Sequence, residues 1–346
     1  MSEQIEYMQK CLQLAKKGSG EVAPNPMVGC IIVHEEKIIG KGFHKKYGTA
    51  HAEVNAINSV KNKELLKSAT LYVNLEPCAH YGKTPPCADL IIKYKIPNIV
   101  IGSIDPNSLV QGKGIERLIK SGCKVNNGVL EEECKELNKR FYTFHKKKRP
   151  YIILKWAQTM DGFIDVKRNK QDIGKPLQIS NERSRKLSHK WRSEEQAIMV
   201  GTNTALLDNP RLTTRKIAGK NPLRIVIDKE LNIPSIYHLF DGSTPTVIFT
   251  GVRKKSKNNL EYVTINFNKN ISKQILSELY KRKTQSVIIE GGTKLLSSFI
   301  EINLWDEARV FVSNKKLKAG IKAPDIKAKG TSTENVDSDK LFIYKN

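Results

Sequence analysis

The sequence predicts an α/β protein of two domains. Strand and helix patterns alternate along both halves of the chain, which is the order expected when helices cover a largely parallel sheet. The length of 346 residues suits about two domains. A charge run with a proline, HKKKRP at 145–150, separates the two series. We therefore predict one domain at 1–146 and a second at 147–346.

The first series begins with helical spacing of apolar residues in 5–15. Strands are predicted at 29–33 and 37–43, joined by the turn HEEK, and at 70–76 and 98–105. Helices are predicted at 87–95, 113–122 and 129–146, and the stretch 50–60 is predicted to be the start of another helix. The last of these carries acids early and lysines late, which matches the helix dipole.

The second series contains six apolar runs that predict strands: 151–157, 197–201, 223–228, 245–250, 286–292 and 308–313. Helical patterns at 181–194 and 270–283 fall between them, and another helix should begin after Gly291-Gly292. This half is also α/β.

Composition favours a cytoplasmic globular protein, with 39% hydrophobic and 27% charged residues. The chain has no apolar run of membrane-spanning length, and its acidic N-terminal segment is not typical of a signal peptide. Six cysteines in such a chain suggest metal binding or catalysis more than disulfides. They are Cys11, Cys30, Cys78, Cys87, Cys123 and Cys134.

The net charge of +24 allows three interpretations: a nucleic-acid partner, anionic small-molecule ligands, or solvated lysine-rich faces. The lysines are scattered and have no interleaved aromatic platform. We therefore favour solvated faces with a contribution from phosphate ligands, and expect no nucleic-acid and no membrane partner.

A metal site is indicated by four residues. His51 and Glu53 lie two apart in AHAEV, and Cys78 and Cys87 follow with eight residues between them. One imidazole and two thiolates suit Zn²⁺ and leave a fourth tetrahedral position for water, whose pKa zinc lowers to roughly 7. Glu53 has the chemistry to move that water's proton. His80 is not expected to bind the metal, because a fourth protein ligand would close the water position.

The order H-x-E, then P-C, then a second cysteine resembles the zinc-dependent nucleobase deaminases. The long spacing in PCAHYGKTPPC, together with PNPMVGCIIV, GKGFHKKYGTAHAEVNAI and DPNSLVQGKG, resembles one branch: the bifunctional deaminase/reductases of riboflavin biosynthesis, the RibD family. In the second half, KWAQTMDGFI, AIMVGTNTALLDNPRLTTR and LRIVID also resemble that family.

The resemblance implies a cytidine-deaminase-like three-layer domain followed by a dihydrofolate-reductase-like domain. It implies zinc-dependent hydrolytic deamination of 2,5-diamino-6-(ribosylamino)pyrimidinone 5′-phosphate, followed by NADPH-dependent reduction of the ribosyl group to ribityl. It also implies a homo-oligomer, either a dimer or a tetramer. The zinc ligands implied are His51, Cys78 and Cys87, with Glu53 catalytic. Contacts to the deaminase substrate are expected from Asn25, His44, His80, Lys83, Thr84 and Asn107.

The second site lacks the G-x-G-x-x-G fingerprint of Rossmann domains. Instead, a strand ends at Glu290 and a glycine pair leads into a helix whose N-terminus suits a phosphate. The resemblance implies NADPH contacts from Ala157, Gln178, Thr204, Asp208, Lys229, Gly292, Thr293, Lys294, Leu295, Leu296, Ser297 and Ser298. It implies reductase-substrate contacts from Pro176, Arg192, Leu212, Arg215 and Glu290.

Three alternatives remain open at this point. A tRNA-editing deaminase with a basic extension would use the positive charge, but predicts Cys-x-x-Cys spacing. A non-catalytic zinc module predicts four protein ligands and gives Glu53 no purpose. The third alternative is that the second domain has lost catalysis and keeps only a binding role. GKPLQIS at 174–180 suggests it, because Pro176 and Gln178 depart from the family pattern.

Overall fold

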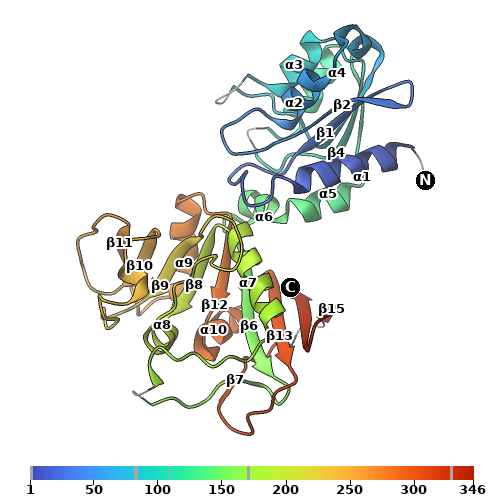
Figure 1. Ribbon diagram of the computed structural model, residues 1–346. Coiled ribbons are helices and arrows are strands. Elements are labelled where there is room, and N and C mark those ends of the chain that lie inside the picture. The colour runs from blue at the N-terminus through green and yellow to red at the C-terminus, as the bar shows by residue number, and fades with distance from the viewer. Residues whose placement is uncertain (1–2, 82–84, 109, 170–171, 328–329) are drawn as a thin grey trace. The chain divides into compact units, whose positions relative to one another are not determined.

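The structure is a computed structural model that describes residues 3–81, 85–108, 110–169, 172–327 and 330–346. The chain divides into two compact units, Met1–Lys148 and Arg149–Asn346, each built around its own sheet (Figure 1). Among the described residues, every helix is too short or too polar to cross a membrane.

The N-terminal unit contains a five-stranded sheet of order β2-β1-β3-β4-β5. β1 is antiparallel to both neighbours, whereas β3, β4 and β5 are parallel. Its helices are α1 (Glu3–Lys16), α2 (Ala52–Ser59), η1 (Lys63–Ser68), α3 (Cys87–Lys93), α4 (Lys113–Lys120), α5 (Glu131–Leu137) and α6 (Lys139–Lys147). Its strands are β1 (Gly29–His34), β2 (Lys37–Phe43), β3 (Thr70–Leu75), β4 (Asn98–Ser103) and β5 (Lys124–Asn127).

Helices cover both faces of the sheet. Side chains alternate along each strand, so neighbouring residues pack against different helices. On β1, Cys30 and Ile32 pack into the cluster that includes residues of α2, α3 and α4. Ile31 and Val33 point to the other face and pack with residues of α1 and α5. Figure 1 shows α2, α3 and α4 on one side of the sheet and α1 and α5 on the other. The predicted three-layer arrangement is confirmed.

The prediction of one helix over 129–146 is wrong. Two helices, α5 and α6, meet at Asn138, whose backbone (φ −103°, ψ 23°) leaves the helical region. The buried Asn138 side chain accepts a hydrogen bond from Met27 N at 2.8 Å and donates one to Met27 O at 2.9 Å. This side-chain amide therefore fixes the backbone at Met27, close in sequence to Asn25. The helix is interrupted at Asn138.

The C-terminal unit contains a nine-stranded sheet of order β11-β10-β9-β8-β12-β6-β13-β16-β15 and a two-stranded ribbon, β14-β7. The large sheet comprises β6 (Tyr151–Thr159), β8 (Ala197–Gly201), β9 (Leu223–Ile227), β10 (Thr246–Thr250), β11 (Leu260–Thr264), β12 (Ser286–Glu290), β13 (Glu307–Ser313), β15 (Gly330–Val336) and β16 (Asp339–Lys345). The ribbon pairs β7 (Phe163–Asp165) with β14 (Ile321–Lys322). The helices are α7 (Glu182–Glu194), α8 (Thr202–Asp208), η3 (His238–Phe240), α9 (Ile271–Lys281) and α10 (Thr293–Glu301).

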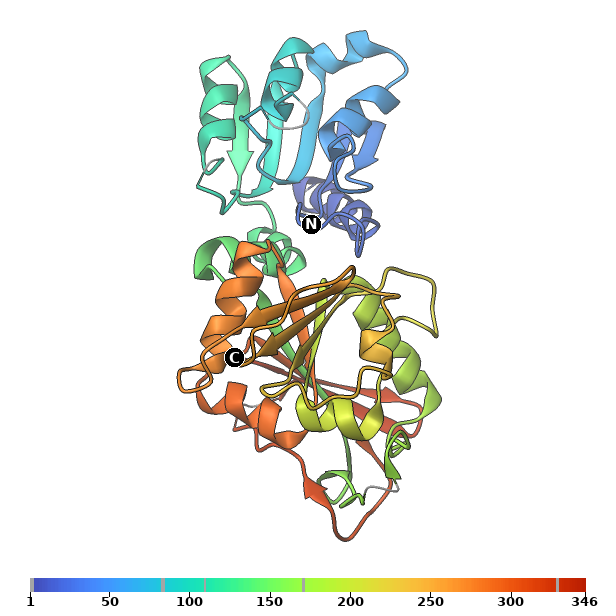
Figure 2. The same ribbon diagram turned by 90° about the vertical axis from the view of Figure 1, so that its left-hand side faces the viewer.

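Helices cover both faces of the large sheet (Figure 2). On one face, α9 and α10 bury Leu279 and Phe299 against β6, β8 and β12. On the other, α7 buries Trp191 and α8 buries Ala205. The strands from β11 to β13 are all parallel, so their carboxyl ends share one edge, which is where open α/β sheets bind ligands.

The loop at 238–246 is held by Arg224 on β9, whose side chain is fully buried. Its guanidinium donates hydrogen bonds to Thr246 Oγ1 at 2.8 Å, His238 O at 2.8 Å and Thr244 O at 2.9 Å. It also pairs with Asp241 at 3.0 Å. A single cation thus satisfies several buried acceptors at once.

We expect Arg224→Met to lower the free energy of unfolding of the C-terminal unit by about 3 kcal/mol, because these acceptors would lose their donor. All three tryptophans of the chain lie in this unit, so urea unfolding followed by tryptophan fluorescence reports on it selectively. Arg183→Met is the control, because Arg183 forms an exposed pair with Asp337 and should matter by less than about 0.5 kcal/mol. Equal stability of the two variants would contradict the assignment.

Candidate metal centre and a second charged site

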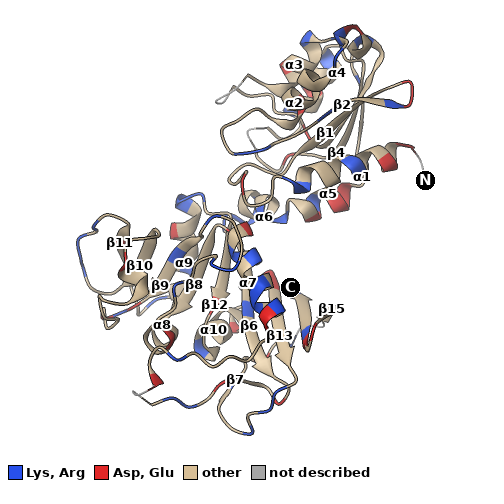
Figure 3. Ribbon diagram, viewed as in Figure 1, with Lys and Arg blue, Asp and Glu red and all other residues tan. Residues whose placement is uncertain are grey.

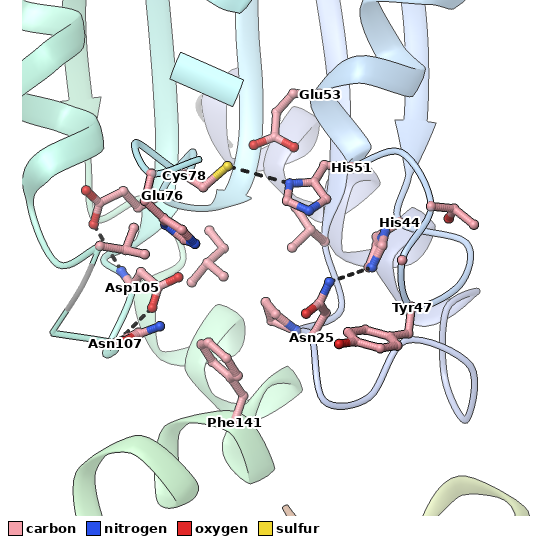
Figure 4. Close-up of a pocket in the computed structure, with 17 residues that line it drawn as sticks. Asn25, His44, Tyr47, His51, Glu53, Glu76, Cys78, Asp105, Asn107 and Phe141 are labelled. Atoms are coloured by element: carbon pink, nitrogen blue, oxygen red, sulfur yellow. Dashed lines mark hydrogen bonds between the residues drawn. The ribbon is translucent and has the colours of Figure 1, made fainter. Parts of the chain in front are cut away.

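The three candidate ligands come together near the starts of two helices, and Figure 4 shows two of them, His51 and Cys78. His51 is the residue before α2, Cys78 follows β3, and Cys87 is the first residue of α3. His51 Nδ1 lies 3.6 Å from Cys78 Sγ and 3.3 Å from Cys87 Sγ. The Cys87 N–H also points at Cys78 Sγ, at 3.3 Å, as expected for a thiolate at a helix start.

This donor set fits zinc. Tetrahedral Zn²⁺ with ordinary bond lengths would separate a nitrogen and a sulfur ligand by about 3.6 Å, close to the two distances here. Among the described residues, His51, Cys78 and Cys87 are the group whose ligand atoms lie within 4.8 Å of one another. His80 is outside this group. Three protein ligands would leave one tetrahedral position for water.

Glu53 is a buried carboxylic acid in the first turn of α2, beside His51 and Cys78 in Figure 4. Burial raises the pKa of Glu53 to about 7, against the opposing charge of His51. Hydrogen bonding to Cys87 and His51 lowers the pKa of the Cys78 thiol to about 4, although burial acts in the other direction. The site therefore combines an easily formed thiolate with a carboxyl group suited to proton transfer at neutral pH.

A cavity of about 280 Å³ opens beside these residues. His44 is buried in its wall, where His44 Nδ1 bonds to Ala50 O and His44 Nε2 accepts from the Asn25 amide, both at 3.1 Å. The other lining residues include Tyr47, His80, Asn107 and Phe141. Of the sequence-predicted substrate residues, Asn25, His44, His80 and Asn107 thus share one cavity, and Lys83 and Thr84 lie outside the described residues.

Two acids in this cavity were missed from the sequence, Glu76 and Asp105. Both are buried, and burial raises the pKa of Asp105 to about 7. Glu76 directly follows β3 and directly precedes Pro77-Cys78. An acid at the end of a buried strand was the available signal for it.

In the C-terminal unit, a partly buried ion pair marks the carboxyl end of β12. Arg192 on α7 contacts both carboxylate oxygens of Glu290, at 2.6 and 3.1 Å, and donates to Thr213 O. Lys155 lies beside Glu290 in the β6–β12 ladder. Burial alone would raise the pKa of Glu290, but Arg192 and Lys155 together lower it to about 2. Sequence reasoning missed Lys155, a lysine inside an apolar strand.

His189, one turn before Arg192, is buried, and its Nδ1 has no hydrogen-bond partner among the described residues. Burial and the charges of Arg192 and Arg215 lower the pKa of His189 to about 4, so this imidazole is neutral at pH 7. The cluster therefore has an excess of fixed positive charge around one carboxylate, an arrangement suited to a phosphate-bearing ligand.

The residues predicted to contact NADPH or the reductase substrate come from several elements of this unit. Gly292 N donates to Thr204 Oγ1 at 3.0 Å, which joins the start of α10 to α8. Asp208 is paired with Arg168 at 2.5 Å. The side chains of Leu296 and Leu212 are buried in apolar clusters. The other predicted positions are Ala157 on β6, Lys229 after β9, Pro176 and Gln178 between β7 and α7, Arg215 after α8, and Thr293, Lys294, Leu295, Ser297 and Ser298 on α10.

Comparison with known proteins matches two parts of the chain to two different families. Residues 1–103 match the family described as the cytidine and deoxycytidylate deaminase zinc-binding region, and residues 150–317 match the RibD C-terminal domain. The riboflavin biosynthesis protein RibD of Aquifex aeolicus is 39% identical over 98% of this chain and 97% of its own length. The chain belongs to the RibD family.

Solved RibD structures share this fold. The Thermotoga maritima deaminase/reductase matches with a TM-score of 0.89 and 36% identity over 99% of this chain and 98% of its own. RibD of Acinetobacter baumannii matches with a TM-score of 0.90 and 30% identity over 99% of both chains. The predictions of family, fold class, both enzyme activities, zinc and NADPH are confirmed. This is a bifunctional deaminase and reductase of riboflavin biosynthesis.

The basic residues fit this outcome without a polyanionic partner being invoked. Lysines and arginines are spread over helices and loops of both units in the view of Figure 3. Arg192 and Lys155 gather around Glu290, and Arg215 lies near Arg192.

Proposed function

We propose that His51, Cys78 and Cys87 hold Zn²⁺ in the deaminase domain, residues 1–146, and that Glu53 transfers protons there. The substrate is 2,5-diamino-6-(ribosylamino)pyrimidinone 5′-phosphate. The observation that carries this proposal is the convergence of one imidazole and two thiols within 4.8 Å beside a buried carboxyl group. The bound metal supplies a water that is acidic enough to ionise near pH 7.

Glu53 performs the proton transfers of this reaction. Its carboxylate accepts a proton from the attacking water and delivers it to the ring nitrogen. It then accepts the proton of the hydroxyl group added to the ring carbon and delivers it to the amino group, which leaves as ammonia. A pKa near 7 suits both directions of transfer, because the same group must act as base and then as acid. The burial of Glu53 keeps bulk water from exchanging that proton.

Asn25 and His44 orient the pyrimidine in this scheme. The His44 Nδ1–H is used by Ala50 O, so His44 Nε2 is an acceptor that holds the Asn25 amide group in place. Asn107, His80, Lys83 and Thr84 complete the proposed contacts to the substrate, with Lys83 directed to its phosphate. Support for Lys83 and Thr84 is the family resemblance alone.

For the reductase domain, residues 147–346, we propose that the deaminated substrate binds at Glu290, Arg192 and Arg215, with Pro176 and Leu212 beside them. NADPH binds along Thr204, Asp208 and the segment 292–298, with Ala157, Gln178 and Lys229 as further contacts. The cofactor supplies a hydride to C1′ of the ribosyl group. Glu290, which is held ionised, orients the substrate through Arg192. The hydrogen bond from Gly292 N to Thr204 Oγ1 supports this proposal, because it joins two of the elements that would contact NADPH, the start of α10 and α8.

Assembly and location belong to the same proposal. We expect a dimer or tetramer, which analytical ultracentrifugation tests, and a cytoplasmic location. Support for the location is that all six cysteines are free thiols, two of them as proposed metal ligands, which a reducing compartment preserves.

Removal of the metal tests the deaminase assignment. Dialysis against a zinc chelator should abolish ammonia release, while NADPH oxidation with the deaminated substrate should continue at its original rate. Added Zn²⁺ should restore ammonia release. Ammonia release that persists without any bound metal would contradict the proposal. Cys87→Ser, compared with the distant Cys123→Ser, should reproduce the loss by weakening the site.

A further inference from the structure

Glu76 is a buried carboxylate in the deaminase unit that the proposed proton transfers do not use. Its side chain bridges backbone segments that are remote in sequence. Glu76 Oε2 accepts hydrogen bonds from the N–H groups of Asp105 at 3.2 Å and Gly112 at 3.0 Å. Glu76 Oε1 accepts from Gly114 at 2.9 Å and Ile115 at 3.3 Å. Both oxygens are thus engaged by backbone donors.

The geometry around these donors specifies a carboxylate. Four N–H groups converge on two oxygens, so a glutamine at this position would direct its amide hydrogens at other donors. The contact is also close: a Cβ added at Gly114 would lie 2.0 Å from Pro77 O. The start of α4 is therefore packed directly against the backbone that leads to Cys78.

The hydrogen bonds of the Glu76 side chain support one wall of the cavity. Asp105 accepts a hydrogen bond from the N–H of Asn107 at 2.8 Å, and both residues line the cavity. In Figure 4 they lie on one side of it, Asn25 and His44 lie on the other, and His51 and Cys78 lie between. Glu76 thus connects the wall formed by Asp105 and Asn107 to the strand that supplies the ligand Cys78.

We propose that Glu76 is a positioning residue of the deaminase, which holds Asp105 and Asn107 at a fixed distance from the metal ligands and thereby sets affinity for the pyrimidine. This inference rests on the proposed function of the cavity. Glu76 contacts neither metal nor substrate in this scheme. It acts through the backbone of the opposite wall, so its loss should weaken substrate binding more than it slows the chemical step.

The experiment compares Glu76→Gln and Glu76→Asp with Glu116→Gln, a control on α4 whose exposed side chain pairs with Lys120. For Glu76→Gln we expect the KM for the diamino substrate to rise about tenfold or more, with kcat within about threefold of wild type. Zinc content and NADPH oxidation should be unchanged. Glu76→Asp keeps the charge and should recover part of the KM. Glu116→Gln should match wild type.

Amide hydrogen exchange provides a readout that is independent of turnover. The amides of Asp105, Gly112 and Gly114 should lose protection in Glu76→Gln, while those of α1 keep it. Unchanged KM and protection would overturn the inference. Loss of zinc with a lower kcat and an unchanged KM would also overturn it, because Glu76 would then serve the metal site. If Glu76→Gln does not fold, Glu76→Asp becomes the test, and a wild-type KM in that variant would overturn the inference.

These outcomes separate the inference from the proposed function. Wild-type protein that releases no ammonia from the diamino substrate would refute the deaminase assignment itself. Hydrogen exchange would then still report whether Glu76 holds the Asp105 segment.

Discussion

Glu53→Gln is expected to lower the rate of ammonia release by about 10²–10⁴-fold, the range that a lost proton-transfer group costs. Glutamine preserves the size of the buried side chain but cannot accept and return a proton. His51, Cys78 and Cys87 are untouched, so zinc should stay bound at the wild-type level. NADPH oxidation with the deaminated substrate should also continue, because the reductase residues lie in the other compact unit.

The measurement pairs an ammonia assay with zinc analysis and NADPH absorbance on the same preparation. Glu64→Gln is the control, since Glu64 is an exposed acid of the same unit. Loss of both activities in a folded Glu53→Gln protein would refute the assignment of two separate sites.

Glu290→Gln is expected to have the complementary effect, a fall of about 10²-fold or more in NADPH oxidation with ammonia release unchanged. The carboxylate of Glu290 is held ionised by Arg192 and Lys155. Its replacement by an amide leaves these two cations without their anion in a largely buried site. Substrate orientation should therefore suffer.

A second Arg–Glu pair of the same unit provides the control. Arg282 contacts both oxygens of Glu261, at 2.8 and 2.5 Å, near the surface. Glu261→Gln removes a similar ion pair away from the proposed site and should leave NADPH oxidation within about twofold of wild type. Equal losses in Glu290→Gln and Glu261→Gln would mean that ion pairing in this unit matters only for stability.

The zinc ligands could be predicted because their signal is local in sequence and chemically restrictive. Two cysteines after a buried strand and an H-x-E at a helix start leave few alternatives. The structure then brings all three ligands within 4.8 Å. His80, the histidine nearest to Cys78 in sequence, is exposed and lies outside that group. His51 was preferred to His80 as the third ligand because a fourth protein ligand would leave no position on the metal for water.

Glu76, Asp105 and Lys155 could not be predicted in the same way. A charged residue beside a strand is usually solvated, and nothing in NLEPC shows that the acid will be covered by residues 105–115. These roles depend on long-range packing. The same reason explains the error at Asn138, because its bonds to Met27 override a helical pattern that looks continuous.

The sheet strands show where sequence patterns are sufficient. Buried parallel strands such as β8 and β12 are short apolar runs and were predicted. The edge strands β11 and β15 were missed, because LEYVT and GTSTENV carry polar residues on an open side and resemble loops.

The most direct test of two independent active sites in one chain is complementation. Glu53→Gln and Glu290→Gln are mixed, and the conversion of the diamino substrate to the ribitylamino product is followed with NADPH present. Each variant alone should form product at least about 10²-fold more slowly than wild type, and the mixture should form it faster than either variant, because one variant deaminates and the other reduces. A mixture that stays inactive, although each variant retains its own partial reaction, would contradict the account.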